Sequence, residues 1–380
     1  MSVQGYCDPQ FQAVADEFAA LLDAPQARGL ALCVQVGGTT VLDLWGGVRD
    51  KDNSQPWQRD TLVNLFSCTK PFAAVALLQL VAEGKLQLDT PIAEYWQEFA
   101  QAGKQAITLR HVLSHQAGVT ALTNALQADD LFDWPTMTAA IAAQAPAWPA
   151  GQTHGYAPIT YGWLTGELLR RVDGRSVGDS VVARSAAPLG LDFFLGLPEQ
   201  EDARVAHLSR GKGDMGDEAA RRLLSVTFTQ PKHLSTLAFT NPPSLMTSTN
   251  KPQWRRMQQP AANGQGHARS LAGFYQGLLA GQLLAAELLT EATREHSQGE
   301  DHTLLTATRF GLGFMLDQPI ANATFGMGPQ AFGHPGAGGS LGFADPERQV
   351  AFGFVTNLMG PYVLMDPRAQ RLAKAVAACL

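Results

Sequence analysis

The chain has 380 residues, of which 45% are hydrophobic and 16% are charged, so it is long enough to bury a large core and to form two lobes. Its net charge of −6 is modest and its lysines and arginines form no basic stripe, which argues against nucleic acid and anionic lipid as partners. No uninterrupted apolar run approaches the roughly 18 residues of a membrane span.

The N-terminus and the cysteines indicate the compartment. Residues 1–8 contain neither a basic stretch nor an apolar one, so no secretory signal is visible. The four cysteines, Cys7, Cys33, Cys68 and Cys379, are too few and too scattered for a disulfide framework. We therefore expect a cytoplasmic protein. The sequence gives no oligomeric state.

A helix and a hairpin are the first predicted elements. The helix opens at Asp8-Pro9, and the hairpin has strands at 30–36 and 41–45 with a turn at Gly37-Gly38. The apolar face of the helix is formed by Phe11, Val14, Phe18 and Leu21.

The next helix carries a Ser-x-x-Lys motif, with Ser67 and Lys70 at its start. Pro71 suits the first turn and Gly84 can close the helix. One turn brings the hydroxyl and the amine onto one face, and the amine can accept the hydroxyl proton if burial or a second cation lowers its pKa. Four-residue matches of this kind also arise by chance. The neighbouring Cys68 points about 100° away, so we interpret it as a packing residue.

The middle of the chain, from about Asp89 to Thr227, has helical periodicity and Pro/Gly loops. His111 and His115 would share a helix face as metal ligands do, but no Glu follows His111 as the zinc-protease motif requires. We expect both to cap or satisfy a buried turn, and we predict neither a metal nor another cofactor. The stretch from Gln200 to Pro231 is predicted to be a long loop bordering the substrate pocket.

Strands return around His334 and in a hairpin with strands at 341–344 and 349–356. Ser340 lies in a Gly-x-Ser-x-Gly sequence like the nucleophile elbow of α/β-hydrolases, which requires a helix after the serine. A strand is predicted there instead, so we do not assign Ser340 as the nucleophile. A helix from Asp366-Pro367 closes the chain.

Strand-rich ends around a helical middle predict an α/β (α+β) fold. One antiparallel sheet would be built from both chain ends and flanked by helices. We expect residues 1–88 and 228–380 to form the α/β domain and residues 89–227 an inserted helical domain. The active site would lie at their interface.

Three motifs, taken in this order, resemble those of the serine β-lactamase (class C) and penicillin-binding-protein superfamily, and within it the family VIII carboxylesterases. The motifs are Ser67-Cys68-Thr69-Lys70, the Tyr156 element at 148–162, and Gly333 to Gly342. The segment 107–119 is similar to a further signature of the superfamily, and the likeness covers about residue 10 to the C-terminus. It implies a β-lactamase-like fold with Ser67 as nucleophile, Lys70 as its base and Tyr156 as the third catalytic group.

Acyl transfer also needs an oxyanion site. We expect its donors to be the backbone N–H groups of Ser67 and Ala337. A phenol is normally protonated at neutral pH, so Tyr156 would act as a base only if Lys70 and the local field favour its phenolate.

Two departures from the lactamase pattern concern the substrate. His334-Pro335-Gly336 stands where lactamases carry Lys-Thr-Gly, so a permanent cation is replaced by a mostly neutral imidazole. Tyr156-Ala157-Pro158 replaces Tyr-x-Asn, so a side-chain amide is missing. We expect His334, Gly336 and Pro158 to contact the substrate.

Small uncharged carboxylic esters need neither the cation nor the amide, so the leading prediction is an esterase that works through an acyl-enzyme on Ser67. One alternative is a β-lactamase or D-amino-acid peptidase or amidase with the same nucleophile. A second is a catalytically inactive binding or assembly module, although such a module would need none of Ser67, Lys70 and Tyr156.

Overall fold

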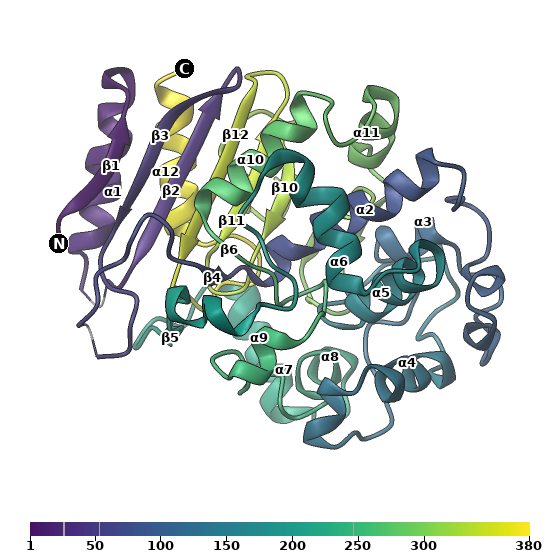
Figure 1. The fold of residues 1–380 in the computed structure, drawn as a ribbon. Coiled ribbons are helices and arrows are strands. Elements are labelled where there is room, and N and C mark those ends of the chain that lie inside the picture. The colour runs from purple at the N-terminus through teal and green to yellow at the C-terminus, as the bar shows by residue number, and fades with distance from the viewer. Residues whose placement is uncertain (26, 53, 246) are drawn as a thin grey trace.

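The structure is a computed structural model that describes residues 1–25, 27–52, 54–245 and 247–380. A nine-stranded antiparallel sheet in the order β1-β3-β2-β12-β11-β10-β9-β8-β7 forms its frame (Figure 1). The strands are β1 (Val3–Cys7), β2 (Leu30–Val36), β3 (Thr39–Gly46), β7 (Ser297–Glu300), β8 (Ala307–Phe310), β9 (Met315–Leu316), β10 (Phe332–Pro335), β11 (Leu341–Asp345) and β12 (Val350–Thr356). Two further pairs are β4 (Val63–Asn64) with β6 (Gln265–Gly266) and β5 (Ser209–Arg210) with β13 (Leu358–Met359).

The two ends of the chain meet in the middle of this sheet, where β12 pairs with β2 in a register from Val350 opposite Val36 to Thr356 opposite Leu30. The predicted sheet built from both chain ends and flanked by helices is therefore confirmed. The predicted hairpin turn is present as well, with positive φ at both Gly37 and Gly38.

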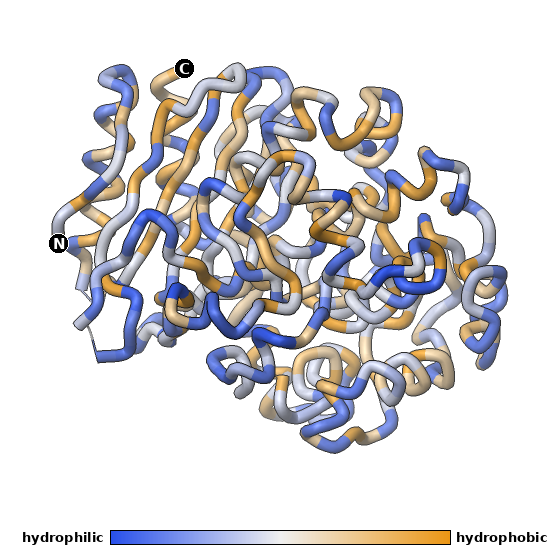
Figure 2. The backbone as a smooth tube through the Cα atoms, viewed as in Figure 1, coloured by the Kyte–Doolittle hydropathy of each residue, from blue (hydrophilic) through white to orange (hydrophobic). Residues whose placement is uncertain are grey.

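Alternating side chains of each strand enter two different cores, as the two-residue period of a strand requires. In β2, Leu32 and Val34 belong to the core under α1 (Gln12–Asp23) and α12 (Pro367–Ala378), whereas Ala31 and Cys33 face the core that contains α10 (Ala268–Leu279). Figure 2 shows hydrophobic stretches along the central strands and hydrophilic stretches in the outer loops.

The remaining elements are mostly helical. The α-helices are α2 (Lys70–Ala82), α3 (Leu109–Leu113), α4 (Trp134–Ala143), α5 (Thr160–Asp173), α6 (Val177–Val181), α7 (Glu218–Thr229), α8 (Leu234–Thr240), α9 (Pro252–Arg256) and α11 (Ala286–Thr293). Short turns of helix are η1 (Pro9–Phe11), η2 (Phe66–Thr69), η3 (Ile92–Glu94), η4 (Gln97–Ala100), η5 (Ala128–Phe132), η6 (Val182–Ala186), η7 (Ala187–Leu189) and η8 (Glu199–Arg204). The domain boundaries at 88/89 and 227/228 stay a proposal.

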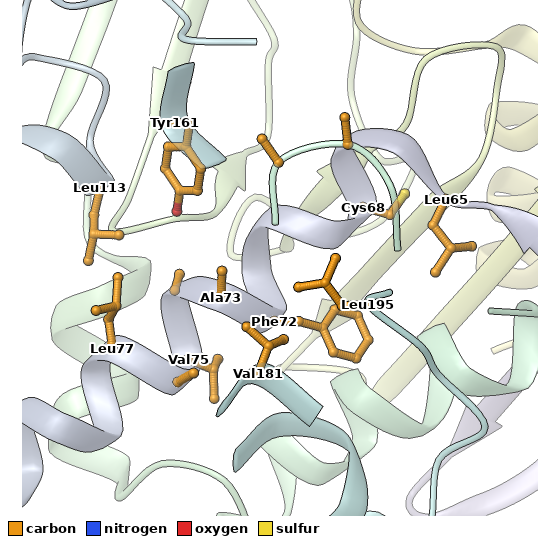
Figure 3. Packing of buried hydrophobic residues seen from close by; sticks show 14 of the residues in the cluster. Leu65, Cys68, Phe72, Ala73, Val75, Leu77, Leu113, Tyr161, Val181 and Leu195 are labelled. Carbon is orange, nitrogen blue, oxygen red and sulfur yellow. The ribbon is translucent and has the colours of Figure 1, made fainter. Parts of the chain in front are cut away.

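Helix α2 is packed on every side, and Figure 3 shows buried residues from several segments gathered around it. Phe72 stacks on Phe193 and Phe274, with ring centroids 4.1 and 3.9 Å apart. Ala73, Val75 and Leu77 are also buried. Close packing of this kind holds a helix rigidly, so the start of α2 has a fixed position.

Several elements were not predicted. Strand β1 contains Gly5 and is largely exposed, so it has no apolar alternation to reveal it. Strands β7 to β9 are short and precede the region around His334 where strands were predicted to return. The predicted loop from Gln200 to Pro231 was wrong in its second half, where α7 is capped by the Asp217 side chain, which accepts from Ala220 N–H.

Candidate active site

Ser67 lies in η2, the short turn of helix that leads directly into α2. The chain bends sharply just before it, because Phe66 has a positive φ of 47°. The N–H of Cys68 donates to Leu65 O at 3.2 Å and so starts the helical hydrogen bonds. The N–H of Ser67 belongs to the first turn, where the donors have no partner within the helix.

Lys70 is fully buried, and its Nζ lies 3.1 Å from Ser67 Oγ. The same Nζ donates to two backbone carbonyls, Pro158 O at 2.9 Å and Ala261 O at 3.0 Å. Burial lowers the pKa of Lys70 well below its ordinary value. The amine form is therefore favoured, and an amine with two N–H bonds to carbonyls has its lone pair left for Ser67.

The Tyr156 hydroxyl donates to Ser67 Oγ at 2.7 Å. Its ring lies 4.7 Å from Lys70 Nζ, so the three side chains expected to act together are in contact. Burial raises the pKa of Tyr156 above its ordinary value. The surroundings thus favour the phenol, so the condition set for a phenolate base is not met.

The third motif brings β10 against η2. A Cβ added to Gly336 would lie 2.4 Å from Leu65 O and 3.2 Å from Cys68 Sγ, so only glycine permits this approach. The Cys68 thiol donates to His334 O at 3.1 Å. Ala337 follows in the turn after β10 and is exposed.

His334 is buried, and its ring centroid lies 5.8 Å from that of Tyr156. Its Nδ1 lies 2.7 Å from Pro335 O, a geometry that places the ring proton on Nδ1 because a carbonyl can only accept. Burial and nearby Lys70 lower the pKa of His334 to about 3. The residue is therefore a neutral imidazole, and its Nε2 has no hydrogen-bond partner in the described part of the chain.

Pro158 and Gly336, both predicted to contact the substrate, have other contacts in the structure. Pro158 is buried and its carbonyl accepts from Lys70. Gly336 faces Leu65 and Cys68. Each residue shapes the site through its backbone.

The two competing nucleophiles occupy unsuitable positions. Burial raises the pKa of the Cys68 thiol to about 12. Ser340 is followed by β11, as predicted, so the strand-turn-helix context of a nucleophile elbow is absent at this serine.

The two histidines of the α3 region satisfy backbone groups. His111 Nδ1 accepts from Thr108 N–H at 3.2 Å in a capping box at the start of α3. His115 Nδ1 accepts from Ala157 N–H at 3.1 Å. Across the described residues, no three His, Cys, Asp or Glu side chains gather as a metal site would require.

Sequence reasoning missed two contributors to the site. The Ala261 carbonyl holds Lys70, but a backbone acceptor leaves no signature in side-chain identity. Asp301 accepts from the N–H of Tyr156, 145 residues away, and no motif surrounds it. Both contacts arise only from the folded arrangement.

In the described part of the chain, no helix has the length and apolar character needed to cross a membrane.

The chain is similar to known proteins over most of its length. The family model described as Beta-lactamase matches residues 14–377. Esterase/beta-lactamase LipL of Mycobacterium tuberculosis is 34% identical over 377 residues, which cover 96% of this chain and 85% of LipL.

Solved structures are similar over the full length. A penicillin-binding protein homolog from Caulobacter crescentus is 37% identical with a TM-score of 0.90, and a family VIII carboxylesterase is 34% identical with a TM-score of 0.89. Each match covers 100% of both chains. The resemblance seen in the motifs is confirmed, and the chain belongs to the beta-lactamase family.

Proposed function

We propose that the protein is a serine carboxylesterase that cleaves small uncharged esters through an acyl-enzyme on Ser67. The observation that carries the proposal is the surroundings of Lys70 Nζ, which has two carbonyl acceptors and one hydroxyl at 2.9 to 3.1 Å. Two N–H groups of a neutral amine satisfy the carbonyls, and the lone pair then faces the Ser67 hydroxyl. A general base needs this geometry and a lowered pKa.

In the acylation step, Lys70 takes the proton of Ser67 while Oγ attacks the ester carbonyl carbon. The N–H groups of Ser67 and Ala337 would stabilise the oxyanion. As the tetrahedral intermediate collapses, the bond from carbon to the alcohol oxygen breaks and Tyr156 O–H protonates the leaving alkoxide. The Lys70 ammonium returns a proton to Tyr156. In deacylation, Tyr156 takes a proton from the attacking water while its own proton passes to Lys70. The bond from the acyl carbon to Ser67 Oγ then breaks, Lys70 returns the proton to Oγ, and the carboxylic acid leaves.

The choice of substrate rests on His334. A neutral imidazole whose Nδ1 proton is engaged by Pro335 O offers no cation to a carboxylate-bearing substrate. Pro158 in addition supplies no side-chain amide for an acylamino group. Uncharged esters require neither contact. The names of LipL and of the family VIII carboxylesterase support ester hydrolysis in relatives of this chain.

The test is turnover of p-nitrophenyl acetate, butyrate and octanoate beside a chromogenic cephalosporin and a D-amino-acid amide. Wild type, Ser67→Ala and Ser340→Ala would be compared. We expect ester turnover to exceed lactam and amide turnover, and to be lost in Ser67→Ala alone. Preference for the cephalosporin or the amide would instead identify a β-lactamase or amidase. No turnover of any of these compounds would indicate a binding module.

A further inference from the structure

The segment that carries Tyr156 belongs to no helix or strand between Ala143 and Thr160. Instead, its backbone N–H groups donate to residues from other parts of the chain. Gly155 N–H donates to His115 O at 3.1 Å, and Ala157 N–H donates to His115 Nδ1 at 3.1 Å. Between them, Tyr156 N–H donates to both carboxylate oxygens of Asp301, each at 3.0 Å. Three consecutive buried donors are thus satisfied by two residues remote in sequence.

Asp301 is itself fixed in place and fully buried. Its Oδ1 accepts from Thr303 N–H and Leu304 N–H, both at 2.8 Å. Its Oδ2 accepts from Thr308 Oγ1 at 3.0 Å, and this hydroxyl lies 2.8 Å from His154 Nε2. These groups hold the same two oxygens that accept from Tyr156 N–H. The carboxylate therefore offers a rigid acceptor to Tyr156 N–H.

A carboxylate without hydrogen bonds would be costly to bury. The N–H and O–H donors of Asp301 offset part of that cost, and burial still raises the pKa of its carboxyl group. The described residues give it no salt bridge to lysine or arginine. A side-chain amide could accept from the same N–H without burying a charge. A buried carboxylate that accepts from the backbone N–H of the catalytic tyrosine therefore suggests a role beyond holding the loop.

We propose that Asp301 is a positioning residue for the reaction, holding Tyr156 through its backbone N–H so that the phenol stays within hydrogen-bond reach of Ser67. This inference rests on the proposed role of Tyr156 in the esterase reaction. It assigns Asp301 no contact with substrate. A displacement of about 1 Å can cost about 10²-fold in rate, so the anchor matters even though it does not react.

Asp301→Asn is the sharpest variant. The amide oxygen can still accept from Thr303, Leu304 and Tyr156 N–H in the place of Oδ1. The NH₂ group replaces Oδ2, so Tyr156 N–H loses one of its two acceptors and faces a donor there, and Thr308 loses its acceptor. We expect kcat to fall about 10- to 100-fold with KM changed less than about threefold, because a positional error in a catalytic group acts on the chemical step.

A double-mutant cycle separates positioning of Tyr156 from general support of the loop. In the Tyr156→Phe background the hydroxyl is already gone, so Asp301→Asn should cost less than about twofold more. The loss should also be larger for ethyl esters than for p-nitrophenyl esters, as in Tyr156→Phe, because a poor leaving group depends more on proton donation. Multiplicative losses in the double variant, or equal losses for both leaving groups, would overturn the proposal.

Asp345→Asn is the matched control. Asp345 is fully buried at the end of β11 and accepts from Glu347 and Arg348 N–H in the turn to β12 and from Gly328 N–H before β10. Unlike Asp301, it also pairs with an arginine, Arg348, at 3.1 Å. We expect it to lower stability without a leaving-group-dependent loss of kcat. Equal losses of kcat in Asp345→Asn and Asp301→Asn would contradict the proposal.

Thr308→Val is a second route if Asp301→Asn does not fold. It removes one donor from Asp301 Oδ2 and leaves the carboxylate in place. We expect a smaller loss of kcat, again absent in the Tyr156→Phe background, and a loss that persists there would contradict the proposal. Failure of the proposed function is seen separately, either as wild type without ester turnover or as an esterase rate that Ser67→Ala keeps.

Discussion

Lys70 and Lys104 are both fully buried, and their hydrogen bonds distinguish a base from a structural cation. Lys104 Nζ donates to three backbone carbonyls, those of Gln101, Ala142 and Gln144, at 2.6 to 2.8 Å. Three acceptors match the three N–H groups of an ammonium. Lys70 has two carbonyls and the Ser67 hydroxyl, so a neutral amine satisfies its surroundings.

The residue-scale prediction concerns Lys70→Arg. A guanidinium stays protonated and cannot act as a base, so kcat/KM should fall about 10²- to 10⁴-fold at neutral pH. Lys104→Arg, checked for native folding by circular dichroism, should keep wild-type kcat/KM. Loss of equal size in both variants would refute the distinction.

The pH profile of the wild type provides a second test of Lys70. Because burial lowers the pKa of Lys70 well below its ordinary value of 10.5, the active amine forms at a lower pH than in an exposed lysine. We expect kcat/KM to fall as the pH drops through this lowered pKa, where Lys70 becomes protonated, and to level off above it. A rise in kcat/KM that is complete only above the ordinary pKa would contradict a neutral Lys70.

At the scale of elements, the oxyanion site depends on how closely β10 approaches η2. Gly336→Ala would force its Cβ against Leu65 O and move the N–H groups of Ser67 and Ala337 apart. We predict a loss of kcat of about 10- to 100-fold, together with about 1–3 kcal/mol of stability from overpacking. Gly211→Ala is the control, since its Cβ would meet only Met359 O at 3.6 Å. An active Gly336→Ala variant would show that this approach is not needed.

Some elements of the fold could be predicted from the sequence and others could not. The spacing of apolar residues and the turn glycines predicted α2, the β2–β3 hairpin and the β11–β12 hairpin. Strand β1 and helix α7 were missed, because exposed apolar residues such as Leu224 and Phe228 blur the pattern of α7. Asp301 and the Ala261 carbonyl could not be predicted, because each lies far in the sequence from the residue that it contacts and only the folded chain brings the two together.

On the scale of the whole molecule, the sheet and its α1–α12 layer share a core that also contains Tyr156. Leu372 on α12 is fully buried in the same core as Phe18 on α1. Leu372→Ala should lower the free energy of unfolding by about 2–5 kcal/mol, measured in urea, and leave kcat/KM of the folded protein unchanged. Lys374→Ala, on the exposed face of α12, should change the unfolding free energy by less than about 0.5 kcal/mol. A selective loss of kcat/KM in Leu372→Ala would mean that this layer tunes the site.

The central claim is that Ser67 is the acylated nucleophile. The most direct measurement is intact mass and peptide mapping after reaction with a p-nitrophenyl alkylphosphonate, which forms a stable adduct on an esterase serine. The account predicts one alkylphosphonyl group, located on Ser67, with simultaneous loss of esterase activity and no adduct in Ser67→Ala. An adduct on Ser340 or Cys68, or full activity in the Ser67-modified protein, would contradict it.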